Sequence, residues 1–371
     1  MRILHVLEPA TAGVPRLVSY IVREQIAAGH DVCVLSPAPL PHSQQFTWVP
    51  WAIRRRRPTS YLRSLVQLHN VHSRFQPDVV HAHSFFAGLL TRLPGSLLPA
   101  TPLVYQPHAW AFDVFGGRAR WLVETWERFA GRRTSVVVTN CQDELQRGRR
   151  AGVTTEGQAV GVAVDIEGLS VPTAAERAQS RANLSLGPGP IVLLLGRIAH
   201  QKGQDQLVRH WNPQQLPAGT RLVLVGQGDV QPLIRAAGDR WGSSILHVGG
   251  TADIRPWLWA ADVMVIPSRY ETVSLVAGEA MATGLPVVAT DFDGAAEVLG
   301  AHGDEPAGVV VGLADMDALM RAIRLLLVDR DHRDRLAAHG RRRAVRYCSP
   351  QSVERALRDV YSVLIPAAKV P

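Results

Sequence analysis

The chain has 371 residues, and its 46% hydrophobic content is enough to bury a sizeable core and to form two domains. Its net charge of +8 is mostly dispersed arginine without a recognisable nucleic-acid-binding motif, so we expect no nucleic-acid partner. No run of about 18 apolar residues could span a membrane, and no signal-peptide core precedes the first strand. Three scattered cysteines, an odd number without metal-ligand spacing, fit a reducing environment, so we expect a cytoplasmic protein.

Short apolar runs alternate with helical patterns along the chain, which predicts an α/β protein with parallel sheets. The first strand is expected over residues 2–7. A helix should follow, with Pro15 in its first turn, its end near Ala28 and Gly29 as its stop. Gly13 lies in the turn between them, where a phosphate or a sugar can approach the backbone closely. A tight turn without a ligand explains the same glycine.

Residues 54–57 are four consecutive arginines that precede an expected helix over residues 59–75. The apolar residues of that helix are expected on one face: Tyr61, Leu62, Leu65, Val66, Leu68 and Val71. Such a basic, amphipathic element could lie on an anionic membrane surface, at the inner membrane face. We favour the alternative, a helix packed on its own sheet with a solvated basic loop before it, because that is the commoner use of such periodicity.

Three histidines follow expected strands in the first half of the chain. His81 and His83 end one strand, and their spacing places both on one face. They could begin a metal site, but no third ligand is evident at a suitable spacing, so we expect no zinc. His108 comes just after the strand at residues 103–105, at the end where parallel sheets bind ligands. A role in binding is therefore predicted for His108, and a packed core histidine is the alternative.

The loop after the apolar strand at residues 191–195 carries two cations. Lys202 is one of only two lysines among the 40 basic residues, and it lies in G-R-I-A-H-Q-K-G, ahead of a stretch that can open a helix. Arg197 offers a planar fork for phosphate oxygens, and Lys202 offers a compact positive charge. This layout suits a diphosphate. Two unrelated cations on a solvated loop are the alternative.

A pair of glutamates brackets the next expected turn. Residues 262–266 form a strand, and Ser274 can cap a helix that continues to Thr283. Glu271 and Glu279 lie eight positions apart, which along a helix corresponds to about 12 Å, so they cannot touch. They could flank an anion at the helix N-terminus and accept hydrogen bonds from hydroxyl groups. An ordinary exposed Glu279 is the alternative.

Together these segments resemble the C-terminal half of retaining GT-B-fold glycosyltransferases of the large bacterial family 4 (group 1) type. That family's pattern is G-R-x(4)-K-G, a G-x-G turn, then E-x(7)-E followed by A-M-A-x-G-x-P-V-V. The chain carries it at Gly196, Arg197, Lys202, Gly203, Gly226, Gly228, Glu271, Glu279 and residues 280–288. One departure is E-T-V-S at residues 271–274 in place of the frequent E-G-F-G, which narrows the room for the sugar. The resemblance covers nearly the whole chain but is sharp only over residues 190–300.

The resemblance implies two Rossmann-like domains that face each other across a cleft. Residues 1–168, with a returning helix in residues 350–371, would form the acceptor domain, and residues 169–349 the donor domain. The implied reaction is metal-independent and needs no cofactor. It transfers a sugar, with retention, from a UDP- or GDP-linked donor to a hydroxyl of a glycan, lipid-linked or small-molecule acceptor.

The resemblance also implies roles for single residues. Arg197 and Lys202 would stabilise the departing diphosphate, Glu271 and His108 would contact the transferred sugar, and Glu279 would hold the ribose hydroxyls. The donor site would further include Gly13, Gly196, Gly226, Thr272, Val273, Ser274 and Leu275, with His81 and His83 on the acceptor side. Two alternatives stay open: a nucleotide-sugar epimerase of the same fold, and a non-catalytic relative that binds a sugar nucleotide or a partner protein.

Overall fold

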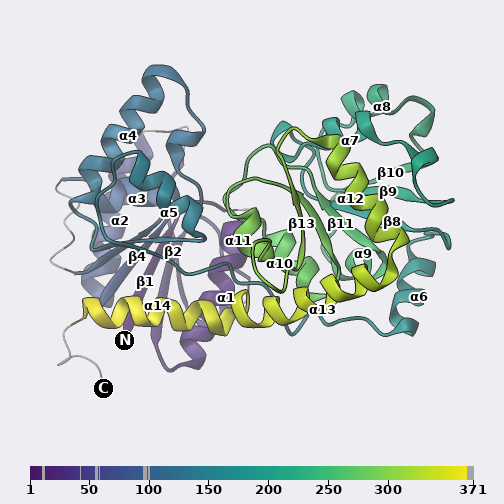
Figure 1. Cartoon of the computed structure of the whole chain (residues 1–371). Coiled ribbons are helices and arrows are strands. Elements are labelled where there is room, and N and C mark those ends of the chain that lie inside the picture. Colours follow the sequence, from purple (N-terminus) through teal and green to yellow (C-terminus); the bar gives the residue numbers. More distant parts are fainter. Residues whose placement is uncertain are drawn as a thin grey trace. The chain divides into compact units, whose positions relative to one another are not determined.

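The computed structural model describes residues 1–10, 13–41, 43–54, 57, 59–94, 98 and 101–365 (Figure 1). The chain divides into two compact units. The first, the N-terminal unit, consists of Met1–Ala163 and Pro350–Pro371, and the second, the C-terminal unit, is Val164–Ser349. Each unit has one sheet, and every registered strand pair in both sheets is parallel.

The N-terminal unit contains a seven-stranded sheet in the order β3-β2-β1-β4-β5-β6-β7. Its strands are β1 (Arg2–Leu7), β2 (Asp31–Ser36), β3 (Thr47–Pro50), β4 (Val79–His83), β5 (Leu103–Gln106), β6 (Val136–Thr139) and β7 (Gly157–Ala159). Its α-helices are α1 (Gly13–Ala27), α2 (Thr59–Phe75), α3 (Ser84–Arg92), α4 (Gly117–Gly131), α5 (Gln142–Arg150) and α14 (Pro350–Leu364). The strand order reverses between β1 and β4, which is where open α/β sheets bind ligands.

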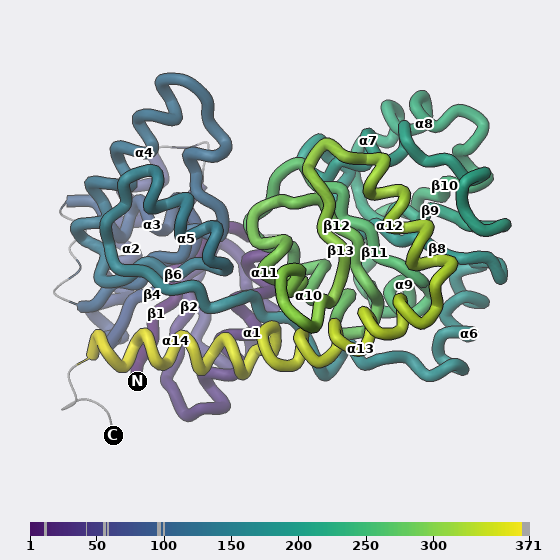
Figure 2. The backbone as a smooth tube through the Cα atoms, in the orientation of Figure 1, coloured from purple at the N-terminus to yellow at the C-terminus, as the bar shows by residue number. Residues whose placement is uncertain are grey.

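The C-terminal helix belongs to the N-terminal unit. Helix α14 packs beside α1, as the backbone trace in Figure 2 also shows. Val353, Leu357 and Val360 of this helix are buried, and so is the hydroxyl-bearing ring of Tyr361, which is 1% exposed. The last helix of the chain therefore completes the fold of the first segment.

Helix α2 packs on its own sheet through part of its predicted apolar face. Leu68 is buried, and Tyr61 and Leu65 pack against the core. The predicted single apolar face is wrong for Leu62 and Val66, whose side chains are 73% and 50% exposed. Two of the four arginines before the helix, residues 55 and 56, lie outside the described residues, so membrane contact by this segment stays a prediction.

The C-terminal unit contains a six-stranded sheet in the order β10-β9-β8-β11-β12-β13. Its strands are β8 (Ile191–Leu195), β9 (Arg221–Val225), β10 (Ile245–Val248), β11 (Val263–Ile266), β12 (Val287–Thr290) and β13 (Gly308–Val311). Its α-helices are α6 (Ala174–Asn183), α7 (Gln204–His210), α8 (Gln231–Ala237), α9 (Arg255–Ala260), α10 (Leu275–Ala282), α11 (Ala295–Leu299), α12 (Met316–Val328) and α13 (Arg330–Tyr347). Among the described helices of both units, none combines the length and apolar character needed to cross a membrane.

Candidate active site

In the C-terminal unit, the turns that follow β8 and β9 touch through glycines. Gly226 follows β9 with φ at 156°, and a Cβ added there would overlap the carbonyl oxygen of Gly196 and lie 3.2 Å from the backbone nitrogen of Arg197. Further along the loop after β8, Gly203 has φ at 71°, and a Cβ there would overlap the carbonyl oxygen of Pro267, which directly follows β11. Only glycine permits these close backbone approaches, so the sequence pattern of glycines reflects the packing of three loops at one end of the sheet.

Lys202 and Glu271 meet at this end of the sheet. Lys202 closes the short 3-10 helix η3 (His200–Lys202) after β8, and Glu271 follows β11, the neighbouring strand. The Lys202 Nζ donates to Glu271 Oε1 at 2.6 Å, and Ser268 Oγ donates to the same oxygen at 2.5 Å. The two side chains are 18% and 7% exposed. The structure thus joins two predicted site residues in an ion pair and adds Ser268, which the sequence pattern did not single out.

A second ion pair holds the same two loops together. Arg269 donates to both carboxylate oxygens of Asp205, at 2.6 and 2.8 Å, and to the carbonyl oxygen of His200 at 2.6 Å. The hydrogen bonds from Arg269 are the main cause that lowers the pKa of Asp205. A bidentate pair of this kind fixes orientation as well as distance. No sequence pattern indicated this pair, because the two residues are distant in the chain and only the pairing of β8 with β11 brings their loops together.

Helix α10 begins where predicted, but the predicted Ser274 side-chain cap is wrong. The Ser274 hydroxyl makes no capping hydrogen bond, and its oxygen is buried without a hydrogen-bond partner among the described residues. Burying a hydroxyl without a hydrogen-bond partner costs about 1–3 kcal/mol. A ligand at this helix N-terminus could supply the missing hydrogen bond. Thr272, Val273 and Leu275 beside it are half-buried.

The remaining predicted residues of this unit differ in their surroundings. The structure excludes an exposed Glu279, because its side chain is 1% exposed within α10. Arg197 is exposed, and its guanidinium makes no hydrogen bond or ion pair with the part of the chain that is described. Of the charged groups at this site, Lys202 is therefore already paired, whereas Arg197 is available to an incoming anion.

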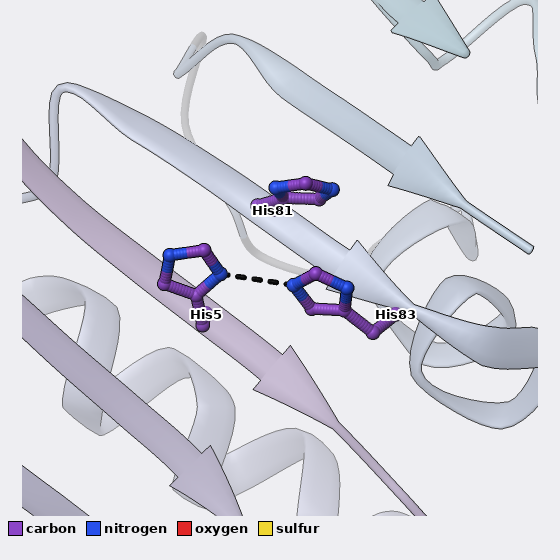
Figure 3. A group of neighbouring side chains, drawn as sticks. All are labelled: His5, His81 and His83. Atoms are coloured by element: carbon purple, nitrogen blue, oxygen red, sulfur yellow. Dashed lines mark hydrogen bonds between the residues drawn. The ribbon is translucent and has the colours of Figure 1, made fainter. Parts of the chain in front are cut away.

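In the N-terminal unit, three buried histidines gather on β1 and β4. The two strands pair in parallel with His5 opposite His81, and His5, His81 and His83 are each 0% exposed (Figure 3). The expectation that no third metal ligand accompanies His81 and His83 is therefore wrong, since one nitrogen from each ring lies within 4.8 Å of the others. His5 escaped notice because its proximity depends on strand register, which the spacing of residues along the chain does not show.

The three rings fit a hydrogen-bonded cluster better than a metal site. His5 Nδ1 and His83 Nε2 are already joined by a hydrogen bond of 2.9 Å. The rings of His81 and His83 stack with centroids 4.0 Å apart and planes inclined by 27°, so their in-plane lone pairs run side by side instead of converging on one point. His81 Nδ1 is bonded to the hydroxyl of Tyr361 at 2.6 Å. His5 and His83 thus have hydrogen bonds that a metal would have to break, whereas His81 Nε2 is buried without a hydrogen-bond partner among the described residues.

His108 joins this cluster from the loop after β5. Its Nε2 lies 2.9 Å from His83 Nδ1, and Asn140 adds a side-chain hydrogen bond to the same ring. Asn140 comes just before α5, a place where asparagine often caps a helix, but Cys141 caps α5 instead. His108 and Ala109 have φ values of 55° and 145°, a left-handed backbone that costs energy in residues other than glycine. We call His5, His81, His83 and His108 the histidine cluster.

The structure places the predicted acceptor-side residues His81 and His83 in the core, so any effect they have on a substrate would have to pass through His108. Their pKa values lie well below 6.5, first because burial disfavours the charged ring and also because they face one another. Gly13 begins α1, and the two residues before it lie outside the described part of the chain. The close approach of a ligand to Gly13 therefore stays a prediction.

Acidification should destabilise the N-terminal unit through the histidine cluster. Burial lowers the pKa of His5 to about 4 and that of His108 to about 3, from about 6.5 in an unfolded chain. As the pH falls through 6.5, the unfolded chain takes up protons that the folded unit does not, so stability is lost progressively from pH 6.5 toward the folded pKa values. The loss is at most about 1.4 kcal/mol per pH unit for each histidine. Calorimetric melting between pH 7 and pH 5 should show it.

Two histidine variants make this measurement specific. His5→Gln removes a cluster histidine and should flatten the pH dependence, whereas His210→Gln removes an exposed histidine of the other unit and should leave it unchanged. A melting temperature that stays constant from pH 7 to pH 5 would contradict neutral, buried histidines.

Comparisons with known proteins agree with this geometry. Residues 12–160 match the family model "Glycosyl transferase 4-like domain", and residues 189–329 match "Glycosyl transferases group 1". The chain is 30% identical over 311 residues to the D-inositol 3-phosphate glycosyltransferase of Xylanimonas cellulosilytica, covering 77% of this chain and 72% of that protein. It is 29% identical over 252 residues to the lipopolysaccharide core biosynthesis mannosyltransferase LpsB of Rhizobium meliloti, covering 65% and 69%.

Solved structures show the same fold. The Anabaena protein HepE, solved in complex with UDP-glucose, matches with a TM-score of 0.81 over 98% of this chain and 100% of that one, at 18% identity. At that identity the likeness speaks for the fold alone.

Proposed function

The chain belongs to the group 1, family 4 glycosyltransferases of the GT-B fold, and from that premise we propose a specific reaction. The enzyme transfers a sugar from a UDP- or GDP-linked donor to a hydroxyl of a glycan, lipid-linked or small-molecule acceptor. It does so with retention of the anomeric configuration and without a metal ion. The sugar nucleotide is a co-substrate, and no cofactor takes part.

The observation that carries this proposal is the end of the sheet in the C-terminal unit. There the Lys202–Glu271 ion pair, the exposed Arg197 next to Gly196, and the Ser274 hydroxyl, which has no partner among the described residues, all follow the paired strands β8 and β11. Phosphate oxygens accept hydrogen bonds from cations, hydroxyls and the N–H groups of a helix N-terminus. These groups together suit a diphosphate better than they suit a neutral ligand.

The charges of these residues suit the departure of a nucleoside diphosphate. When the bond between the anomeric carbon and the phosphate oxygen breaks, negative charge grows on the diphosphate, and positive character grows on the sugar carbon. Arg197, Lys202 and the N-terminus of α10 would stabilise the diphosphate, so the positive charge that a metal would otherwise supply comes from the protein. Glu271, whose Oε1 takes both hydrogen bonds, would have Oε2 to accept one from a hydroxyl of the sugar.

The other parts of the site follow the family pattern. Glu279 would hold the ribose hydroxyls, and His108 would contact the transferred sugar from the N-terminal unit. One named relative is a D-inositol 3-phosphate glycosyltransferase and the other a mannosyltransferase of lipopolysaccharide core biosynthesis, so a phosphorylated polyol or a surface glycolipid is a fitting acceptor class.

Calorimetric titration of UDP, GDP and ADP into the purified protein tests the donor site. We expect one nucleotide to bind at micromolar concentration, equally well with magnesium and with a chelator. Arg197→Ala should weaken that binding by about tenfold or more, because a charge-assisted hydrogen bond is lost. Arg235→Ala, which removes an exposed arginine of α8 in the same unit, is the matched control and should bind as the wild type does.

The outcomes separate the proposal from its rivals. Binding that requires magnesium would overturn metal independence. Binding of a nucleotide without transfer to any acceptor would favour a non-catalytic relative, and a changed sugar released without an acceptor would favour an epimerase. If none of the three nucleotides binds, the proposed donor site is wrong.

A further inference from the structure

The histidine cluster contains a row of hydrogen bonds that leads to His108, and the proposed reaction assigns no role to its inner members. It runs from Gln25 on α1 through His5 and His83 to His108. Gln25 Oε1 lies 2.8 Å from His5 Nε2, His5 Nδ1 lies 2.9 Å from His83 Nε2, and His83 Nδ1 lies 2.9 Å from His108 Nε2. His81 stacks on this chain, but its own hydrogen bond goes to Tyr361 on α14.

We propose that His83, oriented by His5 and Gln25, is a positioning residue that fixes His108 as a neutral ring protonated on Nε2, with its lone pair on Nδ1. The assignment of this tautomer stands on the geometry of the N-terminal unit. Only its effect on sugar transfer rests on the proposed function.

The end of the chain at Gln25 sets the direction of every hydrogen bond. In the structure the Gln25 amide turns Oε1 toward His5 Nε2, and an amide oxygen only accepts, so in this amide orientation His5 donates from Nε2. A neutral imidazole carries one proton, so His5 Nδ1 accepts from His83 Nε2, and His83 Nδ1 in turn accepts from His108 Nε2. The proton of His108 is thereby placed on the nitrogen that faces the protein.

The surroundings keep all these rings neutral. His5, His81 and His83 are fully buried, and the charged influences on the last two come from other histidines. No carboxylate forms an ion pair with a ring of the cluster within the part of the chain that the structure describes, so a positive charge there would lack compensation. Water has little access to this core and does not replace the hydrogen-bond partners of the rings. The donor–acceptor direction of the hydrogen bonds is therefore hard to reverse.

The consequence for His108 is a defined chemical role. With its proton committed to His83, the ring keeps only Nδ1 as an acceptor, and Asn140, whose Oδ1 accepts from Gln106 Nε2, bonds to the same ring. We therefore infer that His108 does not act as a proton donor toward a substrate hydroxyl, and that as an acceptor it exchanges its contact with Asn140 for the hydroxyl. Rotating the ring or moving its proton would remove that acceptor, and misplacement of a catalytic group costs up to roughly 100-fold in rate.

Nitrogen-15 NMR of the histidine side chains tests the tautomer without any substrate. At pH 7 we expect His5, His83 and His108 to show the neutral pattern with the proton on Nε2. Single histidine substitutions assign each NMR signal to its residue. His72→Gln is the control, because His72 is buried in the same unit but bonds to Thr101 and not to the histidine cluster. A wild-type His108 ring protonated on Nδ1, or on both nitrogens, at pH 7 would overturn the proposal. This readout does not depend on whether the variants fold.

Two isosteric substitutions of His83 separate positioning from folding. In His83→Asn the side-chain oxygen can occupy the place of Nδ1 and accept from His108, whereas His83→Gln places its amide near Nε2 and loses that acceptor. We expect His83→Asn to retain the His108 tautomer and most of the kcat for transfer. His83→Gln should change the His108 spectrum and lower kcat roughly 10- to 100-fold, with KM within about twofold.

The two readouts fail independently. Equal His108 spectra in His83→Gln and wild type would show that His83 does not position the ring. If the spectra behave as expected but the wild type transfers no sugar, the tautomer assignment stands and the proposed function is the part that fails.

Discussion

In Lys202→Ala, sugar transfer is expected to fall by roughly 100- to 1,000-fold while both units remain folded. Removing one preorganised group that stabilises developing negative charge has an effect of that size in other enzymes. The lysine is partly exposed, at 18%, and when it is removed Glu271 keeps the hydrogen bond from Ser268, so we expect the C-terminal unit to stay folded. The measurement is kcat with the nucleotide sugar identified by calorimetry, together with the melting temperature of the variant.

Two further variants define what Lys202 does. Lys202→Arg should restore little activity, because a planar guanidinium cannot reproduce a compact charge beside Glu271. Arg235→Ala removes one exposed positive charge from the same unit and should keep full activity. Wild-type activity in Lys202→Ala would contradict the assignment of the donor site, whereas a lowered melting temperature would assign the loss to folding.

Several elements follow directly from local patterns in the sequence. The strands at residues 2–7 and 191–195 and the helix at residues 59–75 begin and end as predicted, because apolar periodicity and adjacent Gly or Pro residues mark them. The Lys202 and Glu271 motifs likewise meet at one end of one sheet, as expected for residues that follow neighbouring parallel strands. Each of these features depends on a short stretch of sequence, whose apolar periodicity and turn residues are enough to predict it.

The features that escaped prediction depend on contacts between distant segments. His5 lies opposite His81 only because β1 pairs with β4 in one particular register. Asn140 meets His108 through the end of β6, although its place before a helix suggested a cap. The prediction that Leu62 and Val66 of α2 are buried was wrong for a related reason. The sheet covers a narrower part of the helix than the apolar periodicity indicates.

A buried ion pair in the N-terminal unit also has no local signal. Arg92, at the end of α3, donates to Glu127 of α4 at 2.9 and 3.2 Å, and the two side chains are 1% and 0% exposed. The Arg92 guanidinium lies 3.6 Å from the ring centroid of Tyr105 and donates to the carbonyl oxygen of Gly88 at 2.8 Å. These contacts compensate both charges. Removing one partner alone would leave the other charge buried and unpaired.

Glu127→Ala should therefore destabilise the N-terminal unit by about 3–5 kcal/mol. For a unit of this size that corresponds to a melting temperature lower by roughly 6–20 °C, measured by differential scanning calorimetry, which can resolve two units that melt separately. Glu124→Ala is the matched control one turn earlier on α4. Its partner Arg120 is 51% exposed, and an exposed pair at this spacing contributes only about 0.3–0.5 kcal/mol.

Replacing both partners, in Arg92→Leu with Glu127→Leu, should recover much of the loss, because no unpaired charge then remains in the core. Equal melting temperatures for Glu127→Ala and Glu124→Ala would show that the buried charge of Arg92 finds another partner or reaches water.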